Sequence, residues 1–234
     1  MNIKHHPTDE TLLAYAGGSL SQAMELIIAT HMTLCPQCRN KVAEFEACGG
    51  AMLNDSASLD MSNDALDHVM AMIEHESANE NARVEPAAIP RRVAVGGSVT
   101  GSAVPSLPTP LANLLPDNIL SLEDIPWRTL APGVKHFPLK SVQTKGSVRL
   151  LKIAPGTSIP DHGHSGHEMT LLLKGSYIDD VGRFRAGDVA DLADDVDHQP
   201  IADTAEDCIC LIATDAPLKF NSILPKLLQP FIGM

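Results

Sequence analysis

Three side chains near the N-terminus have the types and spacing of metal ligands. His31 and Cys35 lie four residues apart in the stretch HMTLCPQC, and Cys38 follows three residues later. Residues four apart on a helix project from the same face, so His31 and Cys35 can meet at one centre, which Cys38 can reach from the start of the next helix. Thiolate and imidazole are the usual ligands of tetrahedral zinc. We therefore predict a structural Zn2+ site, with a redox-active pair or inert buried cysteines as the alternatives.

A tetrahedral site needs a fourth ligand, and the chain offers candidates on either side. Cys48 lies ten residues past Cys38, on the far part of the same predicted helix, whereas His5 and His6 stand at the N-terminus. A short arm can fold back to supply an imidazole. His6 is the more anchored of the pair because Pro7 and the first helix follow it directly. Binding through His6 would contribute folding free energy to a small helical domain.

A second group of candidate ligands appears later in the chain, in the stretch DHGHSGHE. His162 and His164 are two residues apart, so on a strand they point to the same face, and Glu168 begins the next strand. His198 follows ten residues after the turn AGD at 186–188. Three imidazoles and one carboxylate accept zinc, manganese, iron or nickel. We predict a second divalent metal here and assign it as zinc.

Cys208 and Cys210 lie two residues apart in the apolar run CICLIAT, so both face one side of a predicted strand. If that side is the interior of a β-barrel, they are either small core side chains or thiols near the metal that an oxidant can modify. Both interpretations stay open, and the pair is kept as a candidate redox or sensing site. His167, next to Glu168, points the other way and is not expected to be a ligand.

The elements that carry these side chains differ between two zones. Residues 1–77 are typical of four helices, and residues 113–234 of short strands separated by glycines and acidic turns, which favours an antiparallel sandwich or barrel. Residues 78–112 have the Ala, Gly, Ser and Pro content of a linker. The predicted fold is α plus all-β in two domains. The helix boundaries expected from capping and breaking residues are Thr8, Gly17–Gly18, Ser19 or Ser21, Pro36 and Ser62, and Gly49–Gly50 weaken or end the third helix.

The fourth predicted helix carries Leu66, Val69, Met70 and Ile73 at i, i+3, i+4 and i+7, which makes one apolar stripe. The stripe can pack within its own helical bundle, or it can dock on a partner protein. Residues 1–77 also contain eleven acidic and three basic side chains. Such a zone is repelled by nucleic acid and attracted to a basic partner, so we expect no direct DNA binding.

The composition points to a cytoplasmic protein. Five cysteines in 234 residues do not make a disulfide framework. No apolar run approaches the roughly 20 residues of a membrane span, and the N-terminus MNIKHHPTDE lacks the apolar segment of a signal peptide. We therefore expect a soluble chain without membrane contact.

The stretches HHPTDETLLAYAGGSLS and ATHMTLCPQCR resemble the zinc-binding anti-sigma domain of the ChrR-type anti-sigma factors. The H-x3-C-x2-C motif is the hallmark of that family, and its upstream histidine matches His6. The resemblance implies a four-helix domain that binds an extracytoplasmic-function sigma factor, in a 1:1 complex, and blocks its access to core RNA polymerase.

The stretch GTSIPDHGHSGHEMTLLLKG resembles the first cupin motif, with His162, His164 and Glu168 at its ligand positions. The stretch AGDVADLADDVDHQP resembles the second cupin motif more loosely. It lacks the usual P-x-G and has two residues more than is typical before His198. The resemblance implies that residues 113–234 form an antiparallel cupin barrel.

Together these features predict a two-domain regulator that is not an enzyme. The helical domain would sequester the sigma factor, and the cupin domain would hold the second metal as a sensor or modulator. The family resemblance implies release of the sigma factor under oxidative stress, caused by singlet oxygen or peroxide. The alternative is a metal-dependent cupin dioxygenase or isomerase, whose four ligands hold iron or manganese with open positions. A free-standing cupin enzyme would not need the N-terminal zinc domain.

Overall fold

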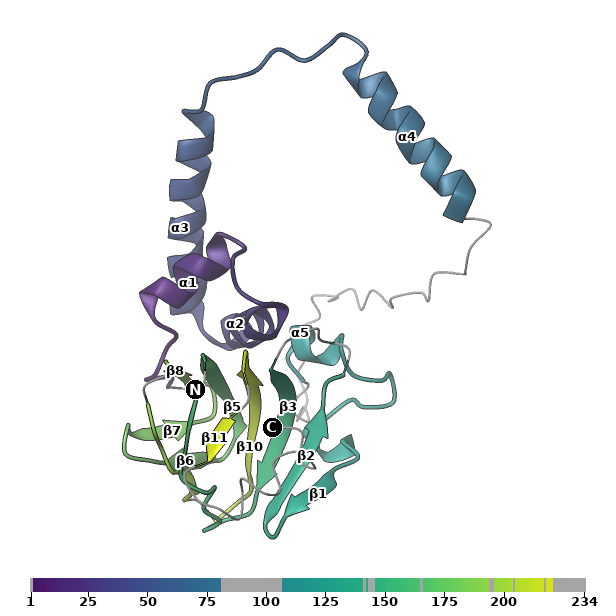
Figure 1. The fold of residues 1–234 in the computed structure, drawn as a ribbon. Helices are drawn as coiled ribbons and strands as arrows, with labels where there is room; N and C mark the ends of the chain where they lie inside the picture. Colours follow the sequence, from purple (N-terminus) through teal and green to yellow (C-terminus); the bar gives the residue numbers. More distant parts are fainter. Residues whose placement is uncertain are drawn as a thin grey trace, which may run out of the picture. The chain divides into compact units, whose positions relative to one another are not determined.

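A computed structural model describes residues 2–80, 107–140, 142, 146–164, 166–193, 196–203, 205–216 and 218–220 of the chain. Helices occupy the first of these segments, and antiparallel strands follow from residue 128 onwards (Figure 1). This order agrees with the predicted α plus all-β fold. Residues 81–106, which make up most of the predicted linker, lie outside the described residues.

The helices of the N-terminal segment are bounded largely as expected. They are α1 (Asp9–Ala16), α2 (Gln22–Leu34), α3 (Pro36–Asn54) and α4 (Ala65–Glu80). The side chains of Thr8 and Ser21 accept backbone N–H groups at the starts of α1 and α2, which confirms both as N-caps. α3 begins at Pro36, as predicted. It continues past Gly49–Gly50, because two glycines cost only about 1 kcal/mol each in a helix.

The strands are short, and their described pairings are antiparallel. They follow a one-turn helix, α5 (Thr109–Ala112), and a 3-10 turn, η1 (Leu122–Asp124). The main sheet has the order β1-β2-β3-β10-β5-β8, and smaller sheets have the orders β7-β6-β9 and β11-β4. The bounds are β1 Arg128–Ala131, β2 Val134–Pro138, β3 Ser147–Ile153, β4 His162–His164, β5 Glu168–Lys174, β6 Ser176–Ile178, β7 Arg183–Arg185, β8 Val189–Leu192, β9 Ile201–Ala202, β10 Cys208–Thr214 and β11 Leu218–Phe220.

The two faces of the main sheet are buried in two separate apolar clusters. Leu171 and Leu211 on one face are buried together with Ile27 and Ile28 of α2. Leu172 on the opposite face belongs to a second cluster, which includes side chains of β6, β7 and β9. Because neighbouring side chains on a strand point to opposite faces, one sheet supports the helices and also lines an interior.

Packing joins the first helices to the strands. α2 contacts β5, β10 and α5. The described residues within 1–49 and 101–234 form one compact unit, and the described residues 50–80 belong to another. Leu107 and Leu111, which fall in the predicted linker, are buried in the first unit. An apolar helix face does not reveal its partner, so the sequence could not indicate this contact. The functional division at residues 1–77, 78–112 and 113–234 stays a prediction.

Candidate metal centres and partner surface

The four N-terminal candidate ligands meet where α2 gives way to α3. His31 lies in the last turn of α2, Cys35 is the C-cap of that helix, and Cys38 follows the first residues of α3. His6 comes from the arm that precedes α1. The donor atoms of these residues all lie within 4.8 Å of one another. The fold thus brings together the four side chains that the sequence indicated.

The separations between these donor atoms fit a single tetrahedral ion. His6 Nδ1 lies 3.5 Å from Cys35 Sγ and 3.4 Å from Cys38 Sγ. His31 Nε2 lies 3.3 Å from Cys38 Sγ. Two ligands that are about 2.0–2.3 Å from a tetrahedral zinc ion lie roughly 3.3–3.8 Å from each other. Both the donor types and their spacing therefore suit zinc.

The other two candidates for the fourth position lie elsewhere. Cys48 is exposed on α3, outside the group. His5 points to the strands, where its ring centroid is 4.4 Å from that of Phe184 and its Nδ1 is 3.3 Å from the Asp188 carboxylate. The geometry therefore agrees with the choice of His6.

Burial shifts the pKa values of two ligands of this group, His31 and Cys38. It lowers the pKa of His31 to about 4, although the Gly187 carbonyl opposes this shift, so the imidazole is neutral at pH 7. Burial and the neighbouring Cys35 raise the pKa of Cys38 to about 12. A metal ion would find His31 ready to bind but would displace a thiol proton from Cys38.

The second group of candidate ligands lies among the strands. His162 is in β4, Glu168 begins β5, and His198 follows β8; each is at most 3% exposed. Their donor atoms lie within 4.8 Å of one another. An antiparallel bridge pairs His162 with His198 and places their ring centroids 4.7 Å apart. This bridge brings His198 next to His162, a proximity that the loosely matching second cupin motif does not establish by itself.

Two hydrogen bonds decide which nitrogen of each imidazole faces the centre. His162 Nδ1 lies 2.8 Å from the Pro160 carbonyl oxygen, and His198 Nδ1 lies 3.0 Å from an oxygen of Asp179. Because these oxygens accept, each Nδ1 carries the proton and donates, and each Nε2 keeps its lone pair for a metal. Asp179 could not be predicted from the sequence, because no spacing rule connects it with His198.

The carboxylate of the second group is held in an unusual state. Burial raises the pKa of Glu168 to about 7, and the Thr170 hydroxyl donates to its Oε1 at 3.4 Å. Burial also lowers the pKa of His162 to about 4. A divalent ion would stabilise the charged carboxylate and bind the neutral imidazole directly. The residues fit a divalent metal, and their types do not choose among several.

Two further histidines, His164 and His167, are close to these ligands in the sequence. The backbone of His164 lies in β4, but its side chain is outside the described residues, so its role as a ligand stays a prediction. His167 does not join the group and instead forms a hydrogen bond with Asp191, which raises the pKa of His167. That His167 is not a ligand stays a prediction.

Cys208 and Cys210 are buried in the apolar cluster between the main sheet and the β6-β7-β9 sheet. Burial raises the pKa of Cys208 to about 12 and that of Cys210 well above its usual value. Within the described residues neither thiol joins a group of metal ligands. Such neutral thiols are slow to react with oxidants, so this environment favours the interpretation as core side chains. Their role in sensing stays a prediction.

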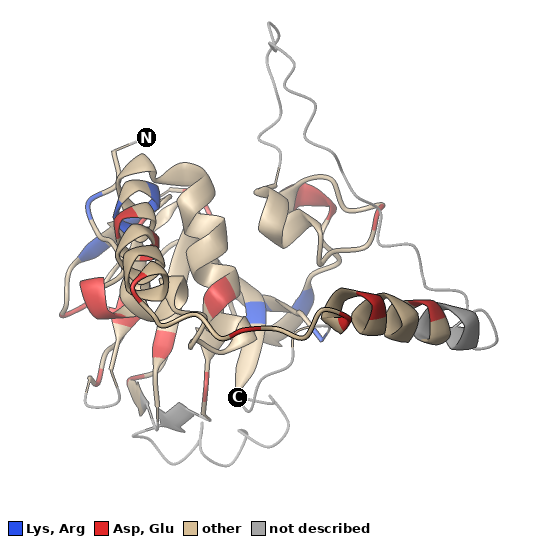
Figure 2. Cartoon of the chain, turned by 90° about the horizontal axis from the view of Figure 1, so that it is seen from above, with Lys and Arg blue, Asp and Glu red and all other residues tan. Residues whose placement is uncertain are grey.

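The apolar stripe of α4 is exposed. Leu66, Val69, Met70 and Ile73 have exposed fractions between 48% and 70%. The same helix also carries acidic residues, which are coloured red in Figure 2. This combination suits a partner that is apolar at its centre and basic around it.

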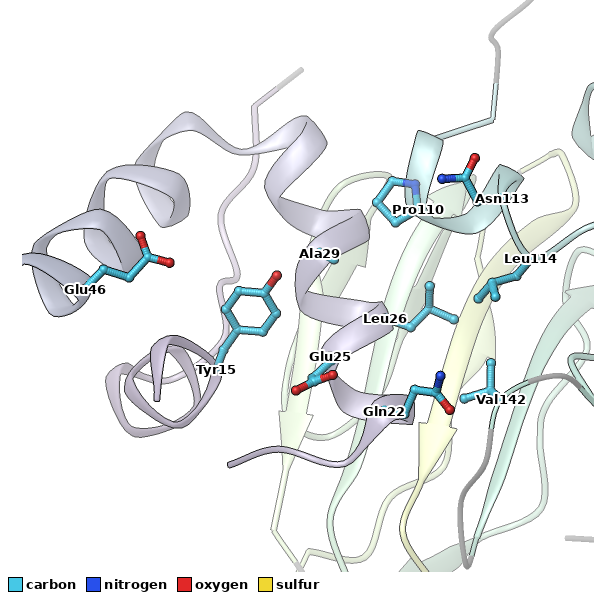
Figure 3. Close-up of a pocket in the computed structure, with 10 residues that line it drawn as sticks. All are labelled: Tyr15, Gln22, Glu25, Leu26, Ala29, Glu46, Pro110, Asn113, Leu114 and Val142. Atoms are coloured by element: carbon cyan, nitrogen blue, oxygen red, sulfur yellow. The ribbon is translucent and has the colours of Figure 1, made fainter. Parts of the chain in front are cut away.

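A groove of about 490 Å³ opens between the first helices and α5 (Figure 3). Leu26 and Leu114 line it together with the acidic side chains of Glu25 and Glu46. Tyr15 lies between these two carboxylates, and burial together with their charge raises its pKa. The groove is therefore apolar in part and carries negative charge.

In the part of the chain that the structure describes, none of the helices has the length and hydropathy of a membrane span.

Comparison with known proteins extends over nearly the full chain. Residues 116–217 match the family model of the ChrR cupin-like domain. The anti-sigma-E factor ChrR of Cereibacter sphaeroides is 41% identical over 231 residues, which cover 99% of both chains. A chain from the crystal structure of Rhodobacter sphaeroides SigE in complex with the anti-sigma ChrR is 37% identical, with a TM-score of 0.69. That match covers 92% of this chain and 100% of the other.

These similarities decide between the two classes of function that the sequence allowed. The relatives are regulators of the anti-sigma class, and the similarity includes the N-terminal helices as well as the cupin strands. The protein is therefore a regulator and not a cupin dioxygenase or isomerase. The chain belongs to the ChrR family of anti-sigma factors.

Proposed function

We propose that this protein binds an extracytoplasmic-function sigma factor in a 1:1 complex and keeps it from core RNA polymerase. The observation that carries the proposal is the similarity of 92% of this chain to a chain of the SigE–ChrR complex. Because RNA polymerase works in the cytoplasm, the proposal places the protein there as well.

The surface that we assign to the sigma factor includes the apolar stripe of α4. Exposed apolar side chains at i, i+3, i+4 and i+7 are typical anchors for a partner helix or groove. Sigma regions that contact promoter DNA are basic, so the acidic residues of the helices, coloured red in Figure 2, favour their approach. Burying the stripe would contribute to the affinity for the sigma factor, and the charges would contribute to the rate of association and to specificity.

We assign zinc to the N-terminal group. The support is the donor set of two thiols and two imidazoles and the separations of 3.3 to 3.5 Å between donor atoms. When bound, zinc acts there as a structural cross-link. His6, His31, Cys35 and Cys38 would then tie the N-terminal arm to α2 and α3 and stabilise the helices.

We further propose that the cupin group holds a second divalent ion, zinc in our assignment, and that it senses or modulates the response to singlet oxygen or peroxide. His162, Glu168 and His198 would bind the ion, with His164 as the fourth ligand. Burial is the main cause of the raised pKa of Cys210, and the charges of Cys208 and Glu168 add to it, so Cys210 lies near the carboxylate of this group. A sensor needs a centre whose metal occupancy can change. The cupin group contains a carboxylate and no thiol, so it should bind zinc more weakly than the N-terminal group does.

Sigma binding is tested by co-purification and calorimetry with candidate sigma factors. Val69→Asp places a charge within the apolar stripe and should weaken binding by about 10- to 100-fold. Met61→Asp is the matched control, because Met61 is 78% exposed and precedes α4. Equal binding by the Val69→Asp variant and the wild type would remove the stripe from the interface. Failure of the wild type to bind any candidate sigma factor would contradict the anti-sigma proposal itself.

The sensor role is tested by reporter transcription from a sigma-dependent promoter, with and without oxidative stress. Glu168→Gln should leave inhibition intact in unstressed cells and reduce release under at least one stress. Cys210→Ala separates the thiol from the metal as the responding group. Normal release by every metal-ligand and cysteine variant, under each stress that acts on the wild type, would refute the sensor role.

A further inference from the structure

The turn between β7 and β8 contacts a ligand of the N-terminal metal group. His31 Nδ1 donates a hydrogen bond of 3.0 Å to the carbonyl oxygen of Gly187, 156 residues further along the chain. A carbonyl can only accept, so the proton lies on Nδ1. His31 Nε2, which is 3.3 Å from Cys38 Sγ, therefore keeps its lone pair toward the thiols. The turn selects the tautomer of His31 that can bind a metal.

The direction of this carbonyl follows from the shape of the turn. Gly187 has a φ of 96°, which lies in the left-handed region that side chains with a Cβ rarely adopt. The turn is closed by two hydrogen bonds between Arg185 and Asp188. The Asp188 N–H donates to the Arg185 carbonyl at 2.8 Å, and the Arg185 N–H donates to the Asp188 carboxylate at 2.9 Å. The acceptor that faces His31 is thus held by a rigid loop.

The same turn also holds the arm that delivers His6. Asp188 is 2% exposed, and one of its carboxylate oxygens accepts the Lys4 N–H at 2.7 Å and the His5 N–H at 3.1 Å. The Val189 N–H in turn donates to the His5 carbonyl at 3.1 Å. The backbone immediately before His6 is therefore fixed to the start of β8.

A further contact from β8 fixes the chain after His6. The Asp191 carboxylate accepts the Thr8 N–H at 2.9 Å. Thr8 is itself the N-cap of α1. His6 is therefore suspended between two anchored points, and both anchors belong to the cupin part of the chain.

We propose that Gly187 and Asp188 are positioning residues of the N-terminal metal site, which is then built jointly by the helices and the cupin strands. The inference rests on the proposed metal binding by His6, His31 and the two thiols. An arm that is already held by Asp188 loses little conformational freedom when His6 binds an ion, whereas a free arm would lose much of it. The cupin part thereby raises the metal affinity of the helical part.

The test uses cobalt(II) and the full-length chain. Among the candidate ligands that the described residues bring together, thiols occur only in the N-terminal group, so thiolate-to-cobalt charge-transfer absorption reports this site and not the cupin group. Asp188→Asn keeps the shape of the side chain but turns one acceptor oxygen into a donor, which must face the arm or Arg185. Competition with a chelator should show an affinity 10- to 100-fold lower than that of the wild type. Asp124→Asn is the control, since Asp124 accepts similar backbone N–H groups at η1.

A double-mutant cycle separates positioning from general destabilisation. If Asp188 acts through His6, Asp188→Asn should have less than about a threefold effect in a His6→Ala background, where cobalt has already lost that ligand. The cobalt d–d bands should shift in the same way in both single variants. If Asp188→Asn fails to fold, His5→Pro removes one N–H donor from the arm without altering the strands, and His5→Ala is its control.

The outcomes distinguish this inference from the metal assignment. A wild-type protein without a thiolate-to-cobalt band would refute the metal site, and the positioning role with it. A normal wild-type band whose affinity is unchanged by Asp188→Asn and His5→Pro would overturn the positioning role alone. An equal loss with and without His6 would overturn the role of Asp188 in positioning the arm, because the effect would then not depend on His6.

Discussion

The two candidate metal groups differ in how the fold supports them. The N-terminal group combines two thiols with two imidazoles, and a carbonyl 156 residues away orients one of its rings. The cupin group combines imidazoles with a carboxylate, and its rings are oriented by Pro160 and Asp179, which lie 2 and 19 residues from them. The first set joins distant parts of the chain, and the second completes a barrel that the strands already form.

This difference separates a structural role from a responsive one. Thiolate-rich tetrahedral sites bind zinc tightly and contribute to folding, whereas sets with imidazole and carboxylate accept several metals and exchange them more readily. We therefore expect changes at the N-terminal group to affect stability and sigma binding. Changes at the cupin group should affect metal occupancy and the response to stress while basal inhibition persists.

The largest effect is expected from Cys38→Ser. Structural zinc sites contribute about 10–16 kcal/mol through four ligands, so loss of one thiolate should cost about 3 kcal/mol or more, at least a hundred-fold in affinity. Metal analysis after dialysis should show loss of the N-terminal ion and retention of the cupin ion, and sigma binding should be lost. Cys48→Ser is the control because Cys48 is an exposed cysteine on the same helix. Full zinc retention by Cys38→Ser would show that the ligand set is wrong.

The next-largest effect is expected in the pH dependence of the stability of the metal-free protein. Burial raises the pKa of Glu168 to about 7, from a usual value of 4.5. The folded state thus keeps a proton that the unfolded state loses, and stability from this group falls as pH rises from about 4.5 to 7. Glu168→Gln stays neutral, so its free energy of unfolding relative to wild type should rise by about 3 kcal/mol over that range. Urea unfolding of the chelator-treated proteins at several pH values measures this difference. A difference in free energy of unfolding between variant and wild type that does not change with pH would contradict the prediction.

A smaller effect is expected when the same variant is loaded with metal. Glu168→Gln replaces a charged ligand by a neutral one and should lower the affinity for the cupin ion roughly a hundred-fold, or about 2.7 kcal/mol. Sigma binding should remain within about twofold of wild type, because the N-terminal group is intact. Calorimetric metal titration together with a sigma-binding assay checks both parts. Loss of sigma binding would mean that the two groups are not separable.

The smallest effect is expected from Cys210→Ala. Cys210 is 3% exposed in an apolar cluster, so removal of its sulfur should cost about 1 kcal/mol of stability through a small cavity. The metal content of both groups should not change. Thermal unfolding and metal analysis test this expectation. A lower metal content would instead assign the thiol to the cupin centre.

Much of the candidate site follows from local spacing. His31, Cys35 and Cys38 obey helical periodicity, and the arm is short enough for His6 to reach them. In the cupin part, the strand period places His162 and the start of β5 correctly, but His198 depends on a bridge between distant residues. Local patterns therefore predict ligands that lie within one or two adjacent elements.

The supporting contacts could not be predicted in this way. The turn at 186–188 was visible as a turn, but nothing in its sequence indicates that Gly187 would accept from His31. The packing of α2 on β5 and β10 was equally hidden, because Ile27 and Ile28 define an apolar face and not its partner. Such contacts depend on how the whole chain folds, which short-range periodicity does not encode.

The hydrogen bonds between Asp188 and the N-terminal arm can form only late in the synthesis of the chain. Lys4 and Asp188 are separated by 184 residues. At roughly 5–20 residues per second, a ribosome needs on the order of ten seconds or more to pass from one to the other. In that interval α1 to α3 have left the ribosome while the arm has no anchor. If Asp188 positions the arm as proposed, synthesis of the strands acts as a delay, and a nascent chain should capture metal less readily than the finished protein.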